Sequence, residues 1–474
     1  MPDSGKPHVV VVGAGAAGMV AAAEVALRVI PRGGRVTCLE KNNKTGVKIL
    51  MSGGSRCNIT HDTDARGITE AFGKARRFLQ PSVGAFPPSA VVEMFRQAGV
   101  AVKREATGKF FPVTDRAIDV RDALHNRMTA SGVALCLNSS VQAIERDASG
   151  AGFHVHVQQT SPRRRAGSIG RPANKDVVTQ HVAHVAGTQQ NQSAMVSEKR
   201  STHLSEPSSH SIIADAVIVT AGGCSWPKCG TTGDGYAWLQ QLGHTIARPH
   251  PALVPLIGGT SATQALSGLT LPDVIASVTT PRHGSGQQDR LSRRSSLLMT
   301  HFGFSGPAAM DVSGRMTALD DISKAELRLD LVPDRTESQL REQFDRSGKK
   351  ATHKINSTLR QFLPTRLADT VAQTCPATTP AELSGKGLHA LITHLKRWHV
   401  PVTDTRGFGK AEVTAGGVAL SEVDPKTMAS RKQPGLFIAG EVLDVDGWIG
   451  GYNFQAAFST GLAAAKGVDR WLAA

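Results

Sequence analysis

The chain has 474 residues, with 54 Lys and Arg against 39 Asp and Glu, a formal net charge of +15. This length exceeds one hydrophobic core, so two or three domains are expected, and the charge predicts attraction to polyanions. Six scattered cysteines support neither a disulfide framework nor a zinc site. The apolar N-terminal stretch lacks a signal-cleavage pattern. We therefore expect a soluble cytoplasmic protein without metal or membrane contact.

The first forty residues carry the pattern of a dinucleotide-binding fold. Residues 9–12 are four consecutive valines, typical of a parallel strand covered on both faces. The strand leads into a G-x-G-x-x-G motif at 13–18, and an Ala-rich helix is predicted over 19–29. A second strand over 35–39 ends in Glu40, whose carboxylate can accept ribose hydroxyls. This order predicts a dinucleotide site; a glycine-rich turn in another α/β fold is the alternative.

Each glycine of the motif has an expected task. Gly13 permits the tight turn after the strand, and Gly15 lets the backbone approach a pyrophosphate. Gly18 lets the helix pack closely on the strand, while the N–H groups at the helix N-terminus, around Ala16 and Ala17, face the anion.

Residues 41–60 form a polar, glycine-rich segment without a helical or strand period, and we interpret it as a loop on the ligand side of the sheet. Gly53 and Gly54 permit close backbone approach there. Lys48 and Arg56 can serve anionic groups.

The next stretch alternates short elements and then becomes polar. Helices are predicted over 89–98 and 118–129, a turn at 108–112, and strands near 100–103, 133–137, 141–144 and 153–157, the last three as a small antiparallel element. Residues 158–210 are rich in Ser, Gln, His and Arg and lack an apolar period, so we expect a disordered surface insertion.

The second half of the chain is predicted to contain short strands and helices in its middle part and to return to an α/β pattern at its end. A buried strand is predicted over 212–220, followed by a helix reaching 242, short strands over 246–331, a basic polar loop at 281–296 and helices over 336–400. A strand over 435–439, a glycine-rich loop at 447–451 and a helix over 453–466 close the chain.

Three apolar strands end in small-residue turns, at 12–13, 220–223 and 438–441. FAD is long, so its adenosine half, pyrophosphate and ribityl chain need separate turns along one sheet. The third turn is similar to the strand-Gly-Asp signature of two-dinucleotide flavoproteins with Glu441 in place of Asp, where it would hold a ribityl hydroxyl. The last helix would aim its positive end at the pyrophosphate or the flavin. A single G-x-G-x-x-G leaves NAD(P)H as a transient donor.

Four segments, SGGSRCNIT, THFGFSGPAAM, AEVTAGGVAL and GLFIAGEVLDVDGWIGGYNFQAAFSTG, closely resemble the BaiN/RdsA-like (HI0933-type) FAD-dependent oxidoreductases. The resemblance covers nearly all of the chain except 158–210 and 281–296. Two departures are Ser55, where the family usually has a third glycine, and Lys109, where it usually has Arg and a bidentate anion contact.

The resemblance implies an α/β fold: an FAD-binding Rossmann-like domain of the two-dinucleotide type with an inserted β-rich plus helical domain. The expected boundaries are 1–245 and 405–474 for the FAD-binding domain, and 246–404 for the insertion, β-rich over 246–335 and helical over 336–404. The expected FAD-binding residues are Gly13, Gly15, Ala16, Ala17, Gly18, Glu40, Lys41, Lys48, Ser52, Gly53, Gly54, Arg56, Asn58, Val141, Ala221, Gly222, Gly223, Gly440, Glu441, Gly450, Gly451, Tyr452 and Asn453.

Activities in the resembled family differ: reduction of an enone in bile-acid derivatives, amine oxidation, and reduction of a uridine in large-subunit ribosomal RNA to dihydrouridine. Residues 335–400 hold eleven Lys and Arg against five Asp and Glu. A basic helical subdomain beside a flavin favours a phosphate-rich substrate, so uridine reduction is our first hypothesis. A merely solvated basic surface, a small-molecule oxidoreductase and a flavin-bearing binding protein without turnover are the alternatives.

In that hypothesis hydride adds to C6 of an extruded uracil and an acid protonates C5. Cys57 is the candidate acid, because unrelated flavin-dependent uridine reductases use Cys and its loop is predicted near the flavin. His301 is the competitor. Each also has a structural interpretation, Cys57 as a small packed side chain and His301 as a hydrogen-bonding one.

Overall fold

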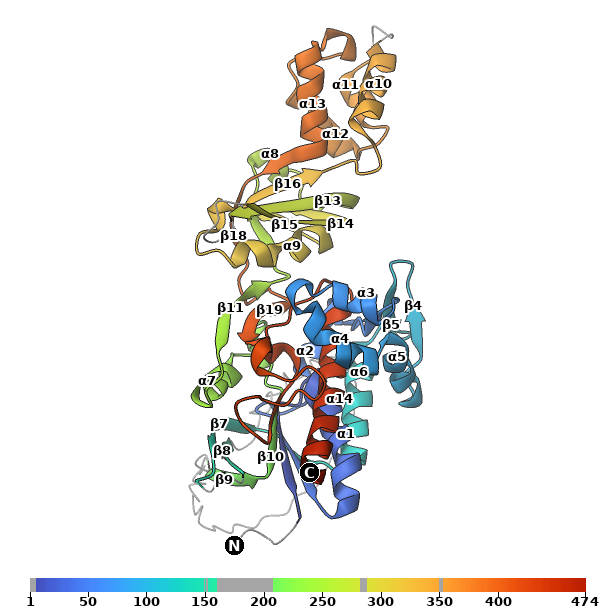
Figure 1. Cartoon of the computed structure of the whole chain (residues 1–474). Helices are drawn as coiled ribbons and strands as arrows, with labels where there is room; N and C mark the ends of the chain where they lie inside the picture. The colour runs from blue at the N-terminus through green and yellow to red at the C-terminus, as the bar shows by residue number, and fades with distance from the viewer. Residues whose placement is uncertain (1–5, 149, 151, 160–207, 282–287, 349–352) are drawn as a thin grey trace, which may run out of the picture.

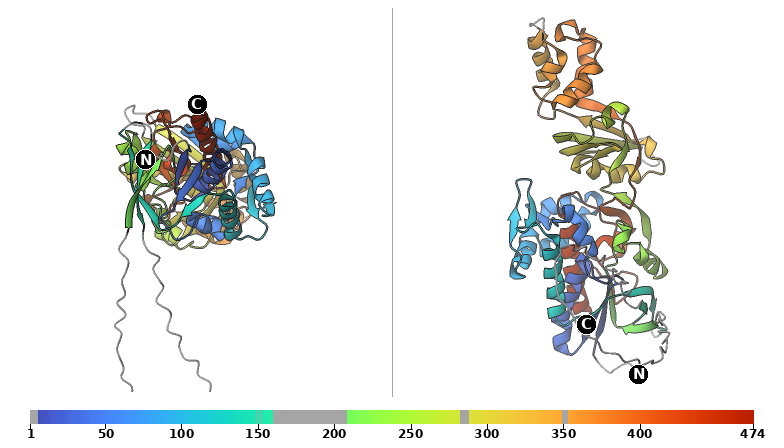
Figure 2. Two further views of the ribbon diagram at one scale, coloured as in Figure 1. Left: turned by 90° about the horizontal axis from the view of Figure 1, so that it is seen from below. Right: turned by 180° about the vertical axis from the view of Figure 1, so that it is seen from behind.

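The computed structural model describes residues 6–148, 150, 152–159, 208–281, 288–348 and 353–474. The molecule is elongated, with a large α/β body at one end, a sheet in the middle and a group of helices at the other end (Figures 1 and 2). Two large hydrophobic cores correspond to the α/β body, here called the Rossmann domain, and to the sheet with its helices, here called the inserted domain.

A five-stranded parallel sheet forms the centre of the Rossmann domain. Its strand order is β20-β10-β1-β2-β6, with bounds Leu436–Ile438, Ala216–Val219, His8–Val12, Arg35–Leu39 and Ala134–Cys136. The helices α1 (Ala16–Val29) and α14 (Tyr452–Ala473) lie side by side with α6 (Ala117–Ala130) beside the sheet (Figure 1). Because all five strands run in parallel, the carboxyl ends of β1, β10 and β20 meet at one edge.

A three-stranded antiparallel sheet lies beside the parallel one. It consists of β7 (Ser139–Arg146), β8 (Phe153–Gln159) and β9 (Ser208–Ala214). The prediction that 133–137 belongs to this element was wrong, because β6 pairs with β2 and extends the parallel sheet.

The single strand predicted over 212–220 is two strands in two sheets. The chain turns at Asp215, whose backbone N–H donates to the His8 carbonyl at 2.9 Å and whose carboxylate accepts from the His8 N–H at 2.6 Å. Because Asp215 caps β1 in this way, the residues before it pair with β8 and the residues after it pair with β1. The predicted insertion at 158–210 begins and ends in β8 and β9; residues 160–207 lie outside the described residues.

The Rossmann domain also contains helices and strands outside these two sheets. They are α2 (Val47–Met51), β3 (Thr60–His61), α3 (Ala65–Glu70), α4 (Arg76–Ala85), α5 (Pro88–Gln97), β4 (Val102–Arg104), β5 (Lys109–Pro112) and α7 (Asp234–Gln241). The predicted turn at 108–112 is therefore largely strand, and the predicted loop at 41–60 contains a short helix.

Short 3-10 segments occur in both domains and lie at Ile30–Arg32, Ser52–Ser55, Gly73–Ala75, Pro227–Cys229, Ile322–Lys324, Pro380–Glu382, Leu420–Glu422 and Gly440–Val442.

The inserted domain contains an antiparallel sheet in the order β17-β16-β13-β14-β15-β12-β18. The bounds are Trp398–Val400, Glu326–Asp330, Thr270–Pro281, Gln288–Thr300, Gly303–Ser305, Leu256–Gly258 and Val402–Thr405. Its helices are α8 (Ser261–Gln264), α9 (Pro307–Thr317), α10 (Glu337–Gly348), α11 (Ile355–Leu359), α12 (Thr365–Gln373) and α13 (Gly385–Arg397).

The prediction of a loop at 281–296 was wrong for the described residues 288–296, which belong to β14. The strand β14 pairs with β13, although its first residues, 288–294, carry mostly polar side chains that are exposed or half-buried. Backbone pairing rather than apolar content therefore makes this segment a strand. Residues 398–404, expected in the helical part, contribute to β17 and β18 instead.

The two domains meet where the chain leaves and re-enters the Rossmann domain. There β11 (Ile246–Ala252) pairs with β19 (Val413–Val418). A third small apolar cluster fills the junction and includes Leu253 of the outgoing chain, Met310 of α9 and Val413 of the returning chain. Among the described helices, none has the length and apolarity that crossing a membrane requires.

Candidate active site

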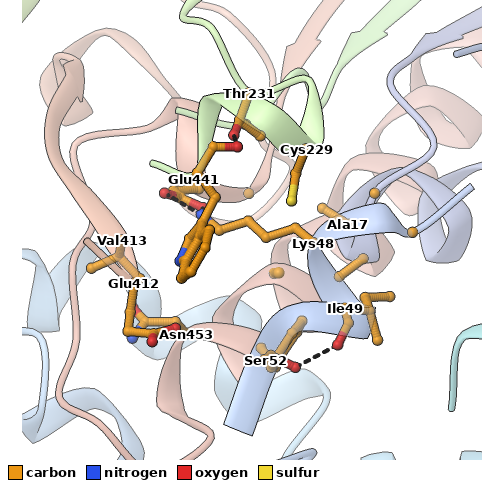
Figure 3. A pocket seen from close by; sticks show the side chains of 18 of the residues that line it. Ala17, Lys48, Ile49, Ser52, Cys229, Thr231, Glu412, Val413, Glu441 and Asn453 are labelled. Atoms are coloured by element: carbon orange, nitrogen blue, oxygen red, sulfur yellow. Dashed lines mark hydrogen bonds and ion pairs between the residues drawn. The ribbon is translucent and has the colours of Figure 1, made fainter. Parts of the chain in front are cut away.

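A cleft of about 620 Å³ runs along the edge where the parallel strands end (Figure 3). It is lined by the turn after β1, the turn after β10, the turn after β20, the 46–58 segment, the N-terminus of α14, and Leu253, Pro307 and Met310 at the inserted domain. Segments more than 400 residues apart in the sequence thus share one elongated cavity.

The glycine motif has the geometry that a bound pyrophosphate requires. Gly13 has φ +97°, and a Cβ at this position would lie 2.7 Å from the Thr220 carbonyl oxygen. A Cβ on Gly15 would meet nothing within 4 Å, because this position faces the open cleft. A Cβ on Gly18 would lie 1.8 Å from the Gly13 carbonyl oxygen, so Gly18 serves packing and does not line the cleft.

Glu40 lies at the end of β2 and lines the cleft, but most of its acceptor capacity is used. One carboxylate oxygen accepts from the Ala14 N–H at 2.8 Å, and the other accepts from the backbone and side-chain amides of Asn42 at 2.9 and 2.7 Å. A carboxylate offers about four lone-pair sites. Glu40 therefore shapes the glycine turn and retains capacity for one further donor.

Lys48 and Glu441 form an ion pair across the middle of the cleft (Figure 3). The ammonium donates to both carboxylate oxygens of Glu441, at 2.9 and 2.6 Å, and the Thr414 N–H donates to one of them at 2.9 Å. Sequence reasoning treated these residues as separate ligand contacts; they neutralise each other in the structure.

The 52–58 segment has unusual backbone geometry. Gly53, Gly54, Ser55 and Cys57 all have positive φ, between 54° and 68°. Ser55, where a glycine is usual in the resembled family, adopts this left-handed conformation at a steric cost of about 1–2 kcal/mol. The side-chain oxygen of Asn58 lines the cleft, is buried, and has no hydrogen-bond partner among the described residues.

These features fit FAD. An unpartnered buried amide oxygen on Asn58, an open approach over Gly15 and two helix N-termini at the same cleft are what a phosphate-containing, polar-edged cofactor needs. At the α14 end, the Asn453 side chain accepts from the Gly447 N–H at 2.8 Å and donates to the Gly447 carbonyl at 3.0 Å, which holds the 447–451 loop.

Most other expected contacts line the cleft, and several are already paired. Lys41 donates to Thr232 and Asp234. Arg56 pairs with Asp115 and Glu105 and stacks 4.1 Å from the Phe111 ring centroid. The expected cofactor residues that line the cleft are Gly13, Gly15, Ala16, Ala17, Glu40, Lys41, Lys48, Ser52, Gly53, Gly54, Arg56, Asn58, Val141, Ala221, Gly222, Gly440, Glu441, Gly450, Gly451 and Asn453.

Three expected cofactor residues lie behind the lining. Gly18 packs on β1. A Cβ on Gly223 would lie 2.4 Å from the Thr414 hydroxyl oxygen, so this glycine serves close packing. Tyr452 stacks on His61, with ring centroids 4.8 Å apart.

Neither expected acid faces the cleft. Cys57 is completely buried, and burial raises the pKa of its thiol to about 12. Proton transfer from Cys57 to a molecule in the cleft would require the 52–58 segment to rearrange. His301 is exposed in the inserted domain, edge-on to the Phe302 ring, and also lies outside the lining.

Sequence reasoning missed Glu412, which lines the cleft where the chain re-enters the Rossmann domain (Figure 3). No described residue donates a hydrogen bond to its carboxyl group. Burial raises the pKa of Glu412, nearby Glu441 raises it further, and Lys48 opposes both. A carboxyl group with a raised pKa keeps its proton to a higher pH, and beside an open cavity it can donate that proton. Its only signal in the sequence was its place in AEVTAGGVAL.

The inserted domain holds one wall of the cleft in position. The buried carboxylate of Asp311 accepts from the Ile449 N–H at 2.8 Å and from Arg293 at 3.1 Å. The Arg293 guanidinium lies 3.4 Å from the centroid of the Trp448 ring. Trp448 and Ile449 line the cleft, so residues of α9 and β14 fix a loop of the other domain.

A family model described as the HI0933-like protein Rossmann domain matches residues 7–169 and 162–467. The chain belongs to this family of FAD-dependent oxidoreductases. The match confirms the resemblance carried by the four segments and agrees with the parallel sheet and its glycine turn.

Curated relatives cover almost the full chain. Two are named ribosomal RNA dihydrouridine synthase: the Escherichia coli (strain K12) protein is 28% identical, covering 96% of each chain, and the Haemophilus influenzae protein is 27% identical, covering 97% of this chain and 98% of its own. A third, a 3-dehydro-bile acid delta(4,6)-reductase of Clostridium scindens, is 26% identical, covering 96% and 97%.

Proposed function

We propose that this protein reduces a uridine of large-subunit ribosomal RNA to dihydrouridine, using NAD(P)H as a transient hydride donor. The observation that carries the proposal is the elongated cleft that joins the three strand turns and opens toward the inserted domain, in a chain whose relatives include two named ribosomal RNA dihydrouridine synthases. The net positive charge of the chain agrees with an RNA substrate.

The chain's residues divide the cleft into regions. The glycine turn and Glu40 would hold the adenosine half of FAD, Lys48 with Glu441 its middle, and Asn58 with the α14 N-terminus its flavin end. When bound, FAD would supply hydride transfer between donor and acceptor. The net reaction adds hydride at C6 and a proton at C5 of uracil and oxidises NAD(P)H to NAD(P)+. Glu412 is the cleft-lining residue suited to supply the proton.

The test is mass spectrometry of ribosomal RNA from cells that lack the gene and from complemented cells. The expected result is loss of one dihydrouridine from the large-subunit RNA and its return on complementation. An unchanged modification map would overturn the RNA assignment. If NAD(P)H also fails to bleach the flavin under anaerobic conditions, the protein is a flavin-bearing binding protein without turnover.

Reduction of a small apolar enone is the second candidate. The cleft is apolar where the domains meet, at Leu253, Met310 and Val413, and one relative is named for bile-acid reduction. Turnover of a steroid enone by protein from cells with an unchanged RNA map would favour this function over RNA modification.

A further inference from the structure

Where the chain crosses from the inserted domain back to the Rossmann domain, cations and aromatic rings alternate on the surface. Residues Trp226, Phe302, Arg406, Phe408 and Lys410 form this patch, here called the crossing strip. Lys410 lies 5.3 Å from the Trp226 ring centroid, and the Arg406 guanidinium lies 4.7 Å from the Phe302 ring centroid. The backbone N–H of Trp226 donates to the Phe408 carbonyl at 3.0 Å, which joins two distant segments of the chain at the strip.

The crossing strip borders the cleft. Trp226 lines the cleft, and Glu412 and Val413, two and three residues beyond Lys410, line it as well. Arg406 and Lys410 are exposed, while the three rings are partly exposed. A polymer lying on the strip would therefore present one of its units at the cleft.

The cations of the crossing strip are free to meet phosphates. Neither Arg406 nor Lys410 forms an ion pair with a described carboxylate, and the neighbouring Asp404 accepts from the Thr405 N–H at 2.7 Å. Cations above aromatic faces, with rings at the same surface, are the elements that bind single-stranded nucleic acid: cations contact phosphates and rings stack on bases.

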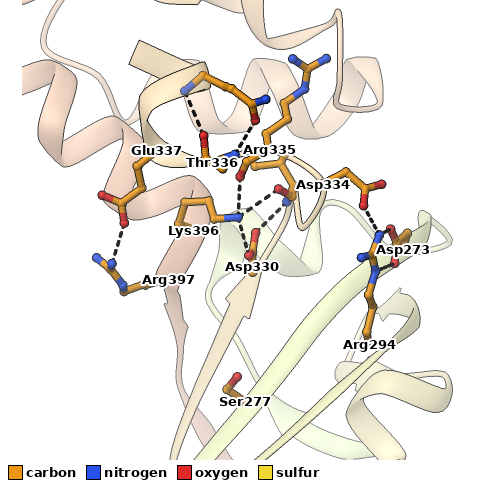
Figure 4. A network of polar contacts seen from close by, with 12 residues as sticks. Asp273, Ser277, Arg294, Asp330, Asp334, Arg335, Thr336, Glu337, Lys396 and Arg397 are labelled. Carbon is orange, nitrogen blue, oxygen red and sulfur yellow. Dashed lines mark hydrogen bonds and ion pairs between the residues drawn. The ribbon is translucent and has the colours of Figure 1, made fainter. Parts of the chain in front are cut away.

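The helical part of the inserted domain, where the sequence placed RNA contact, is different. At its base Arg397 pairs with Glu337, Lys396 pairs with Asp330 at 2.6 Å, and Arg294 pairs with two aspartates (Figure 4). Arg346 and Arg360 are paired with acids on the same surface. Four of the nine described Lys and Arg residues over 335–400 are thus paired with carboxylates, which weakens the attraction of those four for phosphate.

We propose that the crossing strip binds the single-stranded RNA segment next to the target uridine, with Arg406 and Lys410 on phosphates and Phe302 stacked on a base. This inference rests on the proposed function. It adds the surface that positions the RNA, so that an unstacked uridine enters the cleft beside Trp226.

The test measures fluorescence anisotropy of a labelled octauridylate with the full-length, FAD-loaded protein at several salt concentrations. Arg406→Ala with Lys410→Ala should weaken binding at least tenfold and reduce the salt slope by about 1.4, the value for two phosphate contacts on a single strand. Phe302→Ala should weaken binding about tenfold with an unchanged slope, since stacking releases no counterion. Phe302→Leu controls for packing of the β14–β15 turn.

The matched control is Arg341→Ala with Lys386→Ala, which removes the same charge from exposed positions of α10 and α13 that form no ion pair with a described residue. Its affinity should change less than threefold. Equal weakening of octauridylate binding in both double variants, or weakening in the control alone, would overturn the proposal that the crossing strip binds RNA. Rates of flavin bleaching by NAD(P)H should stay at wild-type values in all variants.

Failure of the inference differs from failure of the proposed function. If the wild type restores dihydrouridine and the strip variant binds octauridylate equally well, only the strip is wrong. If the wild type neither binds the RNA nor restores the modification, the RNA function falls and the strip with it.

Discussion

At the residue scale, the choice of proton donor depends on which acid the cleft exposes. Cys57 and His301 carry suitable chemistry, yet neither lines the cavity, whereas Glu412 does. The raised pKa of Glu412 keeps more of its carboxyl group protonated near neutral pH than an exposed glutamate would. Exposure to the substrate space, rather than residue type, decides between these candidates.

Glu412→Gln should slow reduction of the acceptor by roughly 10²–10⁴-fold, since the amide has no acidic proton. FAD content and the rate of anaerobic flavin bleaching by NAD(P)H should stay within twofold of wild type. In the wild type the acceptor half-reaction should decline as pH rises through the Glu412 pKa, because the neutral form is the donor, and the variant should lose this decline. Stopped-flow measurement of both half-reactions checks the prediction.

Glu105→Gln is the matched control, because Glu105 also lines the cleft but is paired with Arg56. Acceptor reduction at the wild-type rate in Glu412→Gln would exclude Glu412 as the donor and return attention to Cys57.

At the scale of elements, the contact between α1 and α14 sets the cleft, because both helices begin at its lining. The contact depends on small residues. A Cβ on Gly461 of α14 would lie 2.5 Å from the Ala17 carbonyl oxygen in α1, and one on Gly440 would lie 2.9 Å from the Ala17 side chain. Two helix N-termini can therefore approach one ligand.

Gly461→Ala should destabilise the Rossmann domain by about 1–3 kcal/mol and weaken FAD retention, because α14 must move away from α1. This result opposes helix propensity, which favours Ala over Gly by about 1 kcal/mol in a helix interior. Urea unfolding and FAD release on dilution measure the two effects.

Gly84→Ala in α4 is the control, since a Cβ there would meet nothing within 4 Å and the residue is exposed. It should be neutral or stabilising by up to about 1 kcal/mol. Equal effects at the two positions would contradict the packing argument.

At the scale of the whole molecule, the junction between the domains contains a carboxylate held in an unfavourable place. Asp446 of the Rossmann domain lies against α9 of the inserted domain, where a Cβ on Gly314 would lie 3.8 Å from its carboxylate oxygen. Burial, together with nearby Asp444, raises the pKa of Asp446 to about 7, while Lys74 and Arg315 oppose the rise.

Because the folded-state pKa exceeds the unfolded value, the folded protein binds more protons between pH 4 and 7, and stability attributable to Asp446 falls as pH rises through this window. Asp446→Asn should remove the penalty and raise the free energy of unfolding at pH 8 by roughly 2–4 kcal/mol, with little effect at pH 4. Urea midpoints of the wild type and the variant at both pH values provide the measurement.

Asp444→Asn should act in the opposite direction, since the Asp444 carboxylate accepts from the Gly416 N–H at 3.1 Å and pairs with Lys74 at 2.7 Å. A loss of stability in Asp446→Asn at pH 8 would show that its ionised carboxylate contributes favourably to the junction.

Local chemistry made much of the fold predictable. Continuous valines at 9–12, glycines at fixed offsets and the acid after β2 each act through backbone sterics or burial over a few residues, so β1, α1 and β2 followed from sequence. The elements that were missed depend on partners far along the chain. The residues at 288–296 look like a loop until β13 pairs with them, and 212–220 look like one strand until Asp215 caps β1.

The candidate site was likewise predictable from the sequence only in part. The sequence by itself determined the family, the three strand turns and 20 of the residues that line the cleft, because these carry local motifs. Only the tertiary structure decided that Lys48 neutralises Glu441, that Cys57 turns inward and that Glu412 faces the cavity. Direction and burial of a side chain, and pairing across hundreds of residues, arise when distant segments pack, and no local pattern records them.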